Sequence, residues 1–202
     1  MKLSIFTLSL VSVALAGLHA SDSPPVGSAA PDFNVSDATG KTHSLSQYKG
    51  KYVVLEWFNP ECPFVKKHYG SGNMQKLQSD YTGKGVIWLS VDSSAPGTEG
   101  NLSPEQAQKV MKDWNTKQTA LLLDSDGKVG RSYNARNTPH MFVINPEGKI
   151  VYEGAIDSKA TPNPNDITSS TNYVKVALDE SMSGKPVSTA NTRPYGCSIK
   201  YK

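Results

Sequence analysis

Residues 52–65 read YVVLEWFNPECPFV, an apolar run that ends in a polar turn, a cysteine and a proline. A nearly continuous run of β-branched, aromatic and leucine side chains is typical of a central β-strand buried on both faces. Residues 59–61 interrupt the run. Proline is favoured in the first turn of a helix, so we expect a helix to begin at Cys62-Pro63. The stretch therefore predicts a buried strand that turns directly into a helix, with a cysteine at the turn.

The place of Cys62 has a chemical consequence. Unpaired N–H groups and the positive end of the helix dipole favour a thiolate over a thiol. In such sites the pKa of a cysteine falls from about 8.5 to about 3.5–7.5. Cys62 is therefore the candidate redox nucleophile, and the alternative is an inert buried thiol. The only other cysteine of the chain is Cys197.

Apolar runs and helical patterns alternate along the rest of the chain. Strands are expected at 35–42, where a hairpin turn ends the strand, and at 52–58, 85–91 and 120–123, and a hairpin of two strands is expected at 141–144 and 149–152. Helical segments are expected at 45–48, from 62 with an interruption at Gly70-Ser71-Gly72, from the capping-box pattern at 103–106, and at 173–182. A short amphipathic stretch follows Gly127. Strands that alternate with helices and close with a hairpin predict an α/β fold with a mixed central sheet. Residues 187–202 show no periodicity.

Length and charge limit the class of protein. The chain has 202 residues, which suits one domain. Its 21 Lys and Arg against 18 Asp and Glu give a formal net charge of +3, without a basic cluster. Nucleic-acid binders carry such a cluster, so no nucleic-acid partner is expected. The hydrophobic fraction of 37% can fill one core and argues against disorder.

The N-terminus has the pattern of a secretory signal. Lys2 precedes a short apolar stretch, and small residues follow. We expect a signal peptide over residues 1–20, with cleavage after Ala20 or, alternatively, after Ala16. The alternative is an uncleaved membrane anchor, which is disfavoured because the apolar run is shorter than the ~20 residues that span a bilayer. After cleavage no stable membrane insertion is expected. The mature protein would be periplasmic or secreted, where disulfides persist.

Several motifs together resemble the thioredoxin fold, in the branch shared by peroxiredoxins and thiol–disulfide oxidoreductases. They are Pro31-Asp-Phe33, Gly50-Lys-Tyr-Val-Val-Leu55, the turn at Cys62, Asn137-Thr-Pro-His-Met-Phe-Val143 and Gly148-Lys-Ile-Val-Tyr-Glu-Gly154. The resemblance covers about residues 24–184 and implies a thioredoxin-like redoxin domain with an N-terminal β-hairpin. The ending Tyr195-Gly-Cys-Ser-Ile-Lys-Tyr201 is similar to the C-terminal signature of a peroxiredoxin-like group. We assign residues 185–202 to a tail that carries Cys197.

The chain also departs from both patterns. Thioredoxin-type sites carry a second cysteine three positions after the first, where this chain has Val65. Peroxiredoxins carry a Thr or Ser three positions before the cysteine and a Pro four positions earlier still. Here these positions are Asn59 and Leu55. A local dithiol and the usual peroxide-activating hydroxyl are therefore both missing, which ranks thiol–disulfide exchange above peroxide reduction.

The resemblance assigns further residues to the site. Pro139 matches the cis-proline that faces the active-site cysteine in this fold, and Thr138 would then present backbone groups to a bound thiol or peptide. Trp57 and Pro63 flank the turn and complete the expected substrate-binding set.

Glu56 lies six residues before Cys62 and matches the buried acidic residue that relays protons in thioredoxins. A carboxylate in an apolar strand is costly unless it is paired or exchanges protons. The alternative is that Glu56 pairs with a nearby Lys such as Lys66, or reaches an edge of the sheet.

The charges that follow Cys62 have two interpretations. Lys66, Lys67 and His68 are expected mainly as solvated groups on a helix face, and the alternative is that one of them favours the Cys62 thiolate. The soft metal ligands His43, His140, Met74 and Met141 come from distant segments without ligand spacing. No metal and no cofactor are expected.

The sequence favours an exported thiol–disulfide oxidoreductase in which Cys62 attacks a disulfide and Cys197 resolves the intermediate. One alternative is a thiol peroxidase that uses the same two cysteines with Asn59 in place of the hydroxyl. The other is a non-catalytic binding module of the same fold in which Cys62 and Cys197 form a permanent disulfide. The expected partners are protein or small-molecule thiols and disulfides, peroxides in the first alternative, and a reducing partner that the sequence does not identify.

Overall fold

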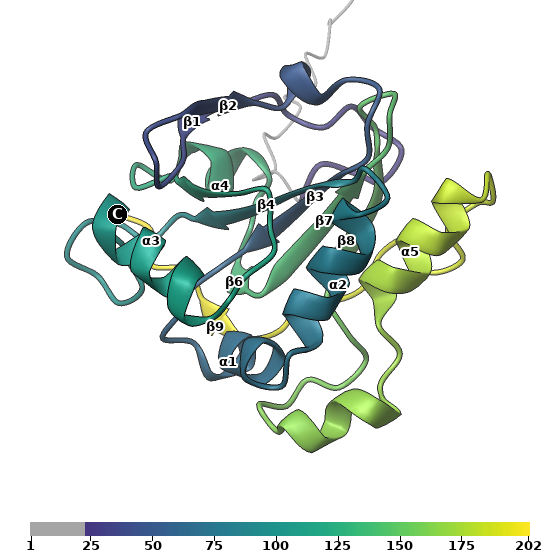
Figure 1. The fold of residues 1–202 in the computed structure, drawn as a ribbon. Helices are drawn as coiled ribbons and strands as arrows, with labels where there is room; N and C mark the ends of the chain where they lie inside the picture. Colours follow the sequence, from purple (N-terminus) through teal and green to yellow (C-terminus); the bar gives the residue numbers. More distant parts are fainter. Residues whose placement is uncertain (1–22) are drawn as a thin grey trace, which may run out of the picture.

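The computed structural model describes residues 23–202, and the predicted signal peptide lies outside them (Figure 1). A five-stranded sheet forms the centre, in the order β5–β4–β3–β7–β8. Its strands are β3 (Val53–Trp57), β4 (Ile87–Asp92), β5 (Ala120–Leu123), β7 (His140–Ile144) and β8 (Ile150–Gly154). β3 runs parallel to β4, and β4 runs parallel to β5, whereas β7 is antiparallel to both β3 and β8. The predicted mixed α/β architecture is confirmed.

The central position of β3 follows from its sequence. All five of its side chains are buried. Successive side chains of a strand point to opposite faces. Val54 accordingly packs with Trp88 on one face, and Leu55 packs with Leu89 on the other. The run read from the sequence as buried on both faces therefore lies between two hydrophobic cores.

Helices cover one face of the sheet, and the N-terminal hairpin with one short helix covers the other (Figure 1). The first face carries α1 (Pro63–Gly70), α2 (Asn73–Thr82), α3 (Pro104–Asp113) and α5 (Tyr173–Met182). The second face carries β1 (Asn34–Ser36), β2 (Thr42–Ser44), the 3-10 turn η1 (Ser46–Tyr48) and α4 (Lys128–Ser132). A further 3-10 turn, η2 (Pro164–Ser169), overlaps the end of the Pro/Asn-rich loop that follows β8.

The predicted capping box at the start of α3 is present. The Ser103 hydroxyl accepts a hydrogen bond from the Gln106 backbone N–H, and the Gln106 side chain accepts one from the Ser103 N–H. We expect Ser103→Ala to lower the free energy of unfolding by about 1 kcal/mol, because a backbone donor of the first turn loses its partner. Denaturant unfolding measures this change. Ser103→Thr, which keeps the capping oxygen, should lose much less, and equal losses in the two variants would contradict the assignment.

The tail after α5 contains a strand that the sequence did not predict. β9 (Cys197–Ser198) pairs antiparallel with β6 (Asn137–Thr138), so that Cys197 lies opposite Thr138. Figure 1 shows β9, in yellow, beside β6 and close to the start of α1. Further along the tail, the Ala95 N–H donates to the carbonyl oxygen of Lys200. The tail is thus bound to the domain by backbone hydrogen bonds at β6 and at Ala95.

Among residues 23–202, no helix is both long enough and apolar enough to cross a membrane.

Candidate active site

Cys62 is the residue at which the turn after β3 becomes helix α1. It occupies the N-cap position, with extended backbone angles, and Pro63 is the first helical residue. Asn59 closes the turn, because its carbonyl oxygen accepts from the Cys62 N–H and its side-chain oxygen accepts from the Glu61 N–H. The strand, turn and helix predicted from residues 52–65 therefore place the cysteine at the N-terminus of the helix. Its side chain is fully buried, at 0% exposed.

Two residues from distant parts of the chain contact the Cys62 sulfur. The Sγ atoms of Cys62 and Cys197 lie 2.7 Å apart, and both cysteines are free thiols. The Thr138 carbonyl oxygen lies 3.1 Å from Cys62 Sγ. The Thr138–Pro139 peptide bond is cis. The structure thus brings together four of the residues that the sequence assigned to the site.

The two thiols have opposite acidities. Burial raises the pKa of Cys62, but hydrogen bonds from Cys197 and from the backbone N–H of Val65 outweigh burial, so the pKa lies below its ordinary value. Burial and the neighbouring Cys62 sulfur raise the pKa of Cys197 to about 12. The shifts favour ionisation of Cys62 over ionisation of Cys197.

Glu56 is fully buried and is surrounded by neutral donors. Its Oε1 accepts from the Tyr69 hydroxyl at 2.9 Å. Its Oε2 accepts from Trp88 Nε1 at 2.8 Å, from Ser90 Oγ at 3.0 Å and from Gln78 Nε2 at 3.3 Å. Burial raises the pKa of this carboxyl above its usual value, and the hydrogen bonds offset only part of that effect. The alternative in which Glu56 pairs with Lys66 is wrong, because Lys66 is exposed and these donors take both carboxylate oxygens.

Lys67 and His68 are not the solvated charges that the sequence suggested. Both are buried, and Lys67 Nζ lies 3.0 Å from Asp157 Oδ2 in an ion pair. Burial lowers the pKa of His68 to about 4, so its ring is neutral at physiological pH. The interpretation failed because Asp157, which makes the burial of Lys67 possible, lies 90 residues away in the chain.

Trp57 and Pro63, the other two expected substrate contacts, lie in different environments. Trp57 is 0% exposed, and its Nε1 donates to Ser93 Oγ. Its ring packs against Phe142 on the sheet face opposite to the core that contains Cys62. Trp57 is therefore a core residue here, and the expectation that it contacts a substrate does not fit its burial. Pro63 is exposed beside Cys62.

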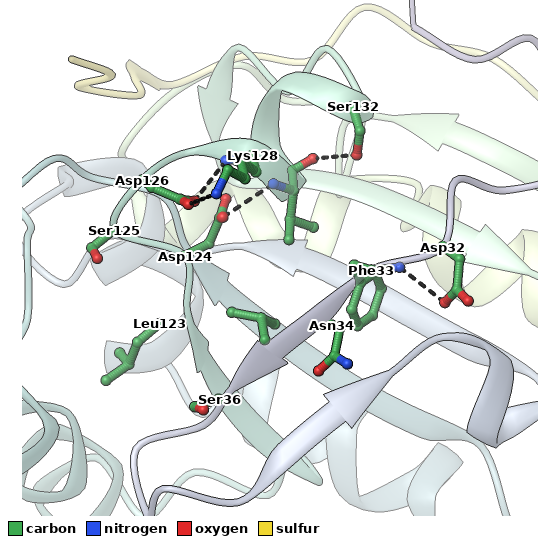
Figure 2. Close-up of a pocket in the computed structure, with 12 residues that line it drawn as sticks. Asp32, Phe33, Asn34, Ser36, Leu123, Asp124, Ser125, Asp126, Lys128 and Ser132 are labelled. Atoms are coloured by element: carbon green, nitrogen blue, oxygen red, sulfur yellow. Dashed lines mark hydrogen bonds and ion pairs between the residues drawn. The ribbon is translucent and has the colours of Figure 1, made fainter.

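A cavity of about 530 Å³ lies between β1 and the segment leading into α4, away from Cys62 (Figure 2). Its carboxylates already have partners. Asp126 pairs with Lys128, and Asp124 accepts from the backbone N–H groups of Val129 and Gly130. In residues 23–202, no group of three or more His, Cys, Asp or Glu side chains is arranged to hold a metal ion.

The sequence missed Tyr195 and Gly196 as site residues. Both belong to the C-terminal motif whose Cys197 was expected to reach Cys62, but the sequence assigned neither of them a contact at the site. Gly196 has φ 120°, and a Cβ at this position would lie 2.1 Å from the Thr138 carbonyl oxygen. This positive φ and close approach explain why glycine precedes Cys197.

Comparisons with known proteins define the class of the chain. Residues 26–153, more than half of the sequence, match the AhpC/TSA family. The chain belongs to this family, and the predicted peroxiredoxin-like relationship is confirmed. The thiol-disulfide oxidoreductase ResA of Bacillus subtilis is 31% identical over 125 residues, which are 62% of this chain and 64% of ResA. The chain thus matches just under two thirds of the length of that relative. The thioredoxin-like protein YneN of the same organism is 25% identical over 135 residues, or 66% of this chain and 74% of YneN.

Solved structures confirm the thioredoxin-like fold. The thioredoxin domain of a thiol-disulfide oxidoreductase from Bacteroides vulgatus is 27% identical, with a TM-score of 0.52, and the match covers 73% of this chain and 98% of that domain. An uncharacterised conserved protein from Geobacillus kaustophilus is 29% identical, with a TM-score of 0.78, and the match covers 92% of this chain and 98% of that one.

Proposed function

We propose that the chain is a thiol–disulfide oxidoreductase in which Cys62 is the nucleophile and Cys197 the resolving cysteine. The observation that carries the proposal is the 2.7 Å contact between the two sulfurs at the N-terminus of α1. The opposite pKa shifts support it, because an exchange reaction needs one thiolate to attack and one thiol held in reserve. The names of the ResA relatives point to the same chemistry.

The reaction runs in two exchanges. The Cys62 thiolate attacks one sulfur of a substrate disulfide, the substrate S–S bond breaks, and the other substrate sulfur leaves as a thiolate that takes up a proton. Cys197 then gives up its proton and attacks Cys62 Sγ in the mixed disulfide. The second substrate sulfur leaves, and a Cys62–Cys197 disulfide remains. Two electrons pass from the protein to the substrate, and a reducing partner must return them. The substrates are protein or small-molecule disulfides.

Equilibration with reduced and oxidised glutathione tests the proposal, with mass spectrometry to count the thiols. A reversible Cys62–Cys197 disulfide, together with reduction of insulin disulfides by the reduced protein, is the expected result. A bridge with a potential below about −300 mV and no insulin reduction would instead identify the permanent structural disulfide of a binding module. Both thiols remaining free at every glutathione ratio would overturn the proposal and that alternative.

Membership of the AhpC/TSA family makes a thiol peroxidase the second candidate. Asn59 occupies the position of the missing hydroxyl, but it is buried and its side-chain oxygen is already bound to the Glu61 N–H. We expect Cys62 to react with hydrogen peroxide no faster than a small free thiolate does. Stopped-flow oxidation kinetics measure this rate. A rate many orders of magnitude higher would rank the peroxidase first.

The shifted pKa of Cys62 predicts a measurable titration. The ultraviolet absorbance of the Cys62 thiolate, taken as the difference between the wild type and Cys62→Ser, should develop at a lower pH than that of an ordinary thiol. In Cys197→Ala the midpoint should move upward, because the hydrogen bond that stabilises the thiolate is lost. An unchanged midpoint in Cys197→Ala would show that the second sulfur does not govern the first.

Glu56 is proposed as the proton relay of the resolving step. Its raised pKa means that the folded protein holds this proton more tightly than the unfolded chain does. The stability that Glu56 contributes is therefore lost as the pH rises from the unfolded pKa towards the folded one. Glu56→Gln should flatten that part of the stability profile and slow the second exchange. Ser90→Ala keeps the carboxyl but removes a donor that lowers its pKa, so it should keep the pH dependence of the rate and shift it to higher pH. If the exchange kinetics of Glu56→Gln equal those of the wild type between about pH 5 and 9, Glu56 is not the proton relay.

Export and the domain division complete the proposal. The charged, apolar and small-residue pattern of residues 1–20 supports a cleaved signal, and the two cysteines suit an oxidising compartment. A redoxin domain over 24–184 and a tail over 185–202 would form the mature protein. N-terminal sequencing of the protein from fractionated cells is expected to begin near Ser21. An intact Met1 on cytoplasmic protein would contradict export.

A further inference from the structure

A buried ionic cluster lies where the tail crosses α1, two residues before Cys197. Lys67 Nζ lies 3.0 Å from Asp157 Oδ2 and donates to the Lys159 carbonyl oxygen at 2.9 Å. The Tyr195 hydroxyl donates to the other oxygen of the same carboxylate, Asp157 Oδ1. The exposed fractions of the Lys67 and Asp157 side chains are 0% and 2%. A hydrogen bond to a charged group is stronger than one between neutral groups. The hydrogen bond from the Tyr195 hydroxyl to Asp157 is therefore one of the strong contacts between the tail and the domain.

The Tyr195 ring also packs against the helix that begins at Cys62. Its centroid lies 5.7 Å from that of Phe64, the second residue of α1. Lys67 Nζ lies 5.7 Å from the centre of the Tyr195 ring, within the range of a cation–π contact. The His68 ring nitrogen Nε2 lies 3.4 Å from the Tyr195 hydroxyl oxygen. Tyr195 therefore joins the tail to the same helix that orients Cys62.

Only Gly196 separates this anchor from Cys197. Beyond Cys197 the strand pairing is short, because β9 has two residues. Beyond β9 the tail is held by the Ile199 N–H, which donates to the Arg136 carbonyl oxygen, and by the Lys200 carbonyl oxygen, which accepts from the Ala95 N–H. Before Cys197, the nearest side chain that binds the tail to the domain is Tyr195. The position of Tyr195 thus sets where the Cys197 side chain can lie relative to Cys62 Sγ.

We propose that Tyr195, held by the Lys67–Asp157 ion pair, is a positioning residue that keeps Cys197 Sγ against Cys62 Sγ and thereby favours their disulfide. This inference rests on the proposed function and deepens it. It assigns a role to a buried charge cluster that the exchange reaction does not otherwise use. Tyr195 does not touch the reacting sulfurs and acts only through the place of Cys197.

Tyr195→Phe tests the proposal, because it removes the hydroxyl and keeps the ring that packs on Phe64. The readout is the equilibrium constant for forming the Cys62–Cys197 disulfide from oxidised glutathione. The matched control is Tyr201→Phe, which removes another tail hydroxyl, bonded to the Ala135 carbonyl oxygen on the far side of Cys197. The thermal midpoint of the reduced form is measured for all three proteins.

We expect the equilibrium constant to fall about tenfold in Tyr195→Phe, the size of effect that a lost hydrogen bond to a charged group produces. Tyr201→Phe should stay within about twofold of the wild type, as expected for a tail contact that does not set the position of Cys197. A constant that is unchanged in Tyr195→Phe, or lowered equally in both variants, overturns the positioning role. A merely structural hydroxyl would lower the thermal midpoint and leave the constant unchanged. The proposed function fails separately, if the wild-type protein forms the disulfide but does not reduce insulin.

Discussion

Cys197→Ser is expected to stop the reaction after the first exchange and to leave the substrate bound to Cys62 through a mixed disulfide. The wild-type resolving thiol lies 2.7 Å from Cys62 Sγ, whereas a serine hydroxyl cannot attack a disulfide. In this variant an external thiol would have to resolve the mixed disulfide, a step that the neighbouring Cys197 thiol performs in the wild type. We therefore expect turnover with insulin to fall by about two orders of magnitude or more, because held groups react at effective concentrations far above those of free thiols.

Mass spectrometry without reductant should find the trapped adduct on Cys62 of this variant. The control is Cys62→Ser, which should form far less adduct on Cys197, since burial still raises the pKa of Cys197 when the Cys62 sulfur is absent. Full turnover of Cys197→Ser would show that another thiol resolves the intermediate and that the contact between the two sulfurs is incidental.

Gly196→Ala should displace the tail from the active site. A Cβ at position 196 would lie 2.1 Å from the Thr138 carbonyl oxygen, and the φ of 120° is one that L-residues rarely adopt. Backbone strain of this kind costs about 1–3 kcal/mol, and relieving the overlap requires β6 and β9 to separate. We expect the free energy of unfolding to fall by about 2 kcal/mol or more. Cys62 should become accessible to alkylating reagents.

The matched control for this substitution is Gly184→Ala. Gly184 has φ 72°, but no heavy atom lies within 4 Å of the position its Cβ would take. Gly184→Ala therefore reports backbone strain alone and should leave Cys62 protected. If both variants protected Cys62 equally, the tail would tolerate the overlap, and the close approach to Thr138 would not explain the glycine.

The part of the site that could be predicted from sequence is the part built from adjacent residues. The apolar run, the Asn-Pro break and the proline after Cys62 determine the strand, turn and helix locally, and the structure confirms them. The alternation of side chains along a strand also predicts the orientation of Trp57. Because Trp57 follows Glu56, its side chain must point to the opposite face of the sheet.

The contacts that complete the site join residues far apart in the chain. The Lys67–Asp157 pair spans 90 residues and the Cys62–Cys197 contact spans 135. A two-residue strand such as β9 has too few positions to show a period, so the tail carried no signal for its own pairing. The sequence around Lys67 gives no sign that this residue is buried, because its partner Asp157 lies in a distant loop.

The contact between two sulfurs 135 residues apart also ties the redox state of the protein to its resistance to unfolding. Folding, reduction, unfolding and oxidation form a closed thermodynamic cycle, so the free energy by which the fold favours the disulfide equals the free energy by which the disulfide stabilises the fold. For a closed loop of this length that shared quantity reaches about 5 kcal/mol in the chain-entropy account. Each donation of electrons to a substrate would thus leave a protein that is harder to unfold and to proteolyse, and each return of electrons would leave one that is easier to degrade.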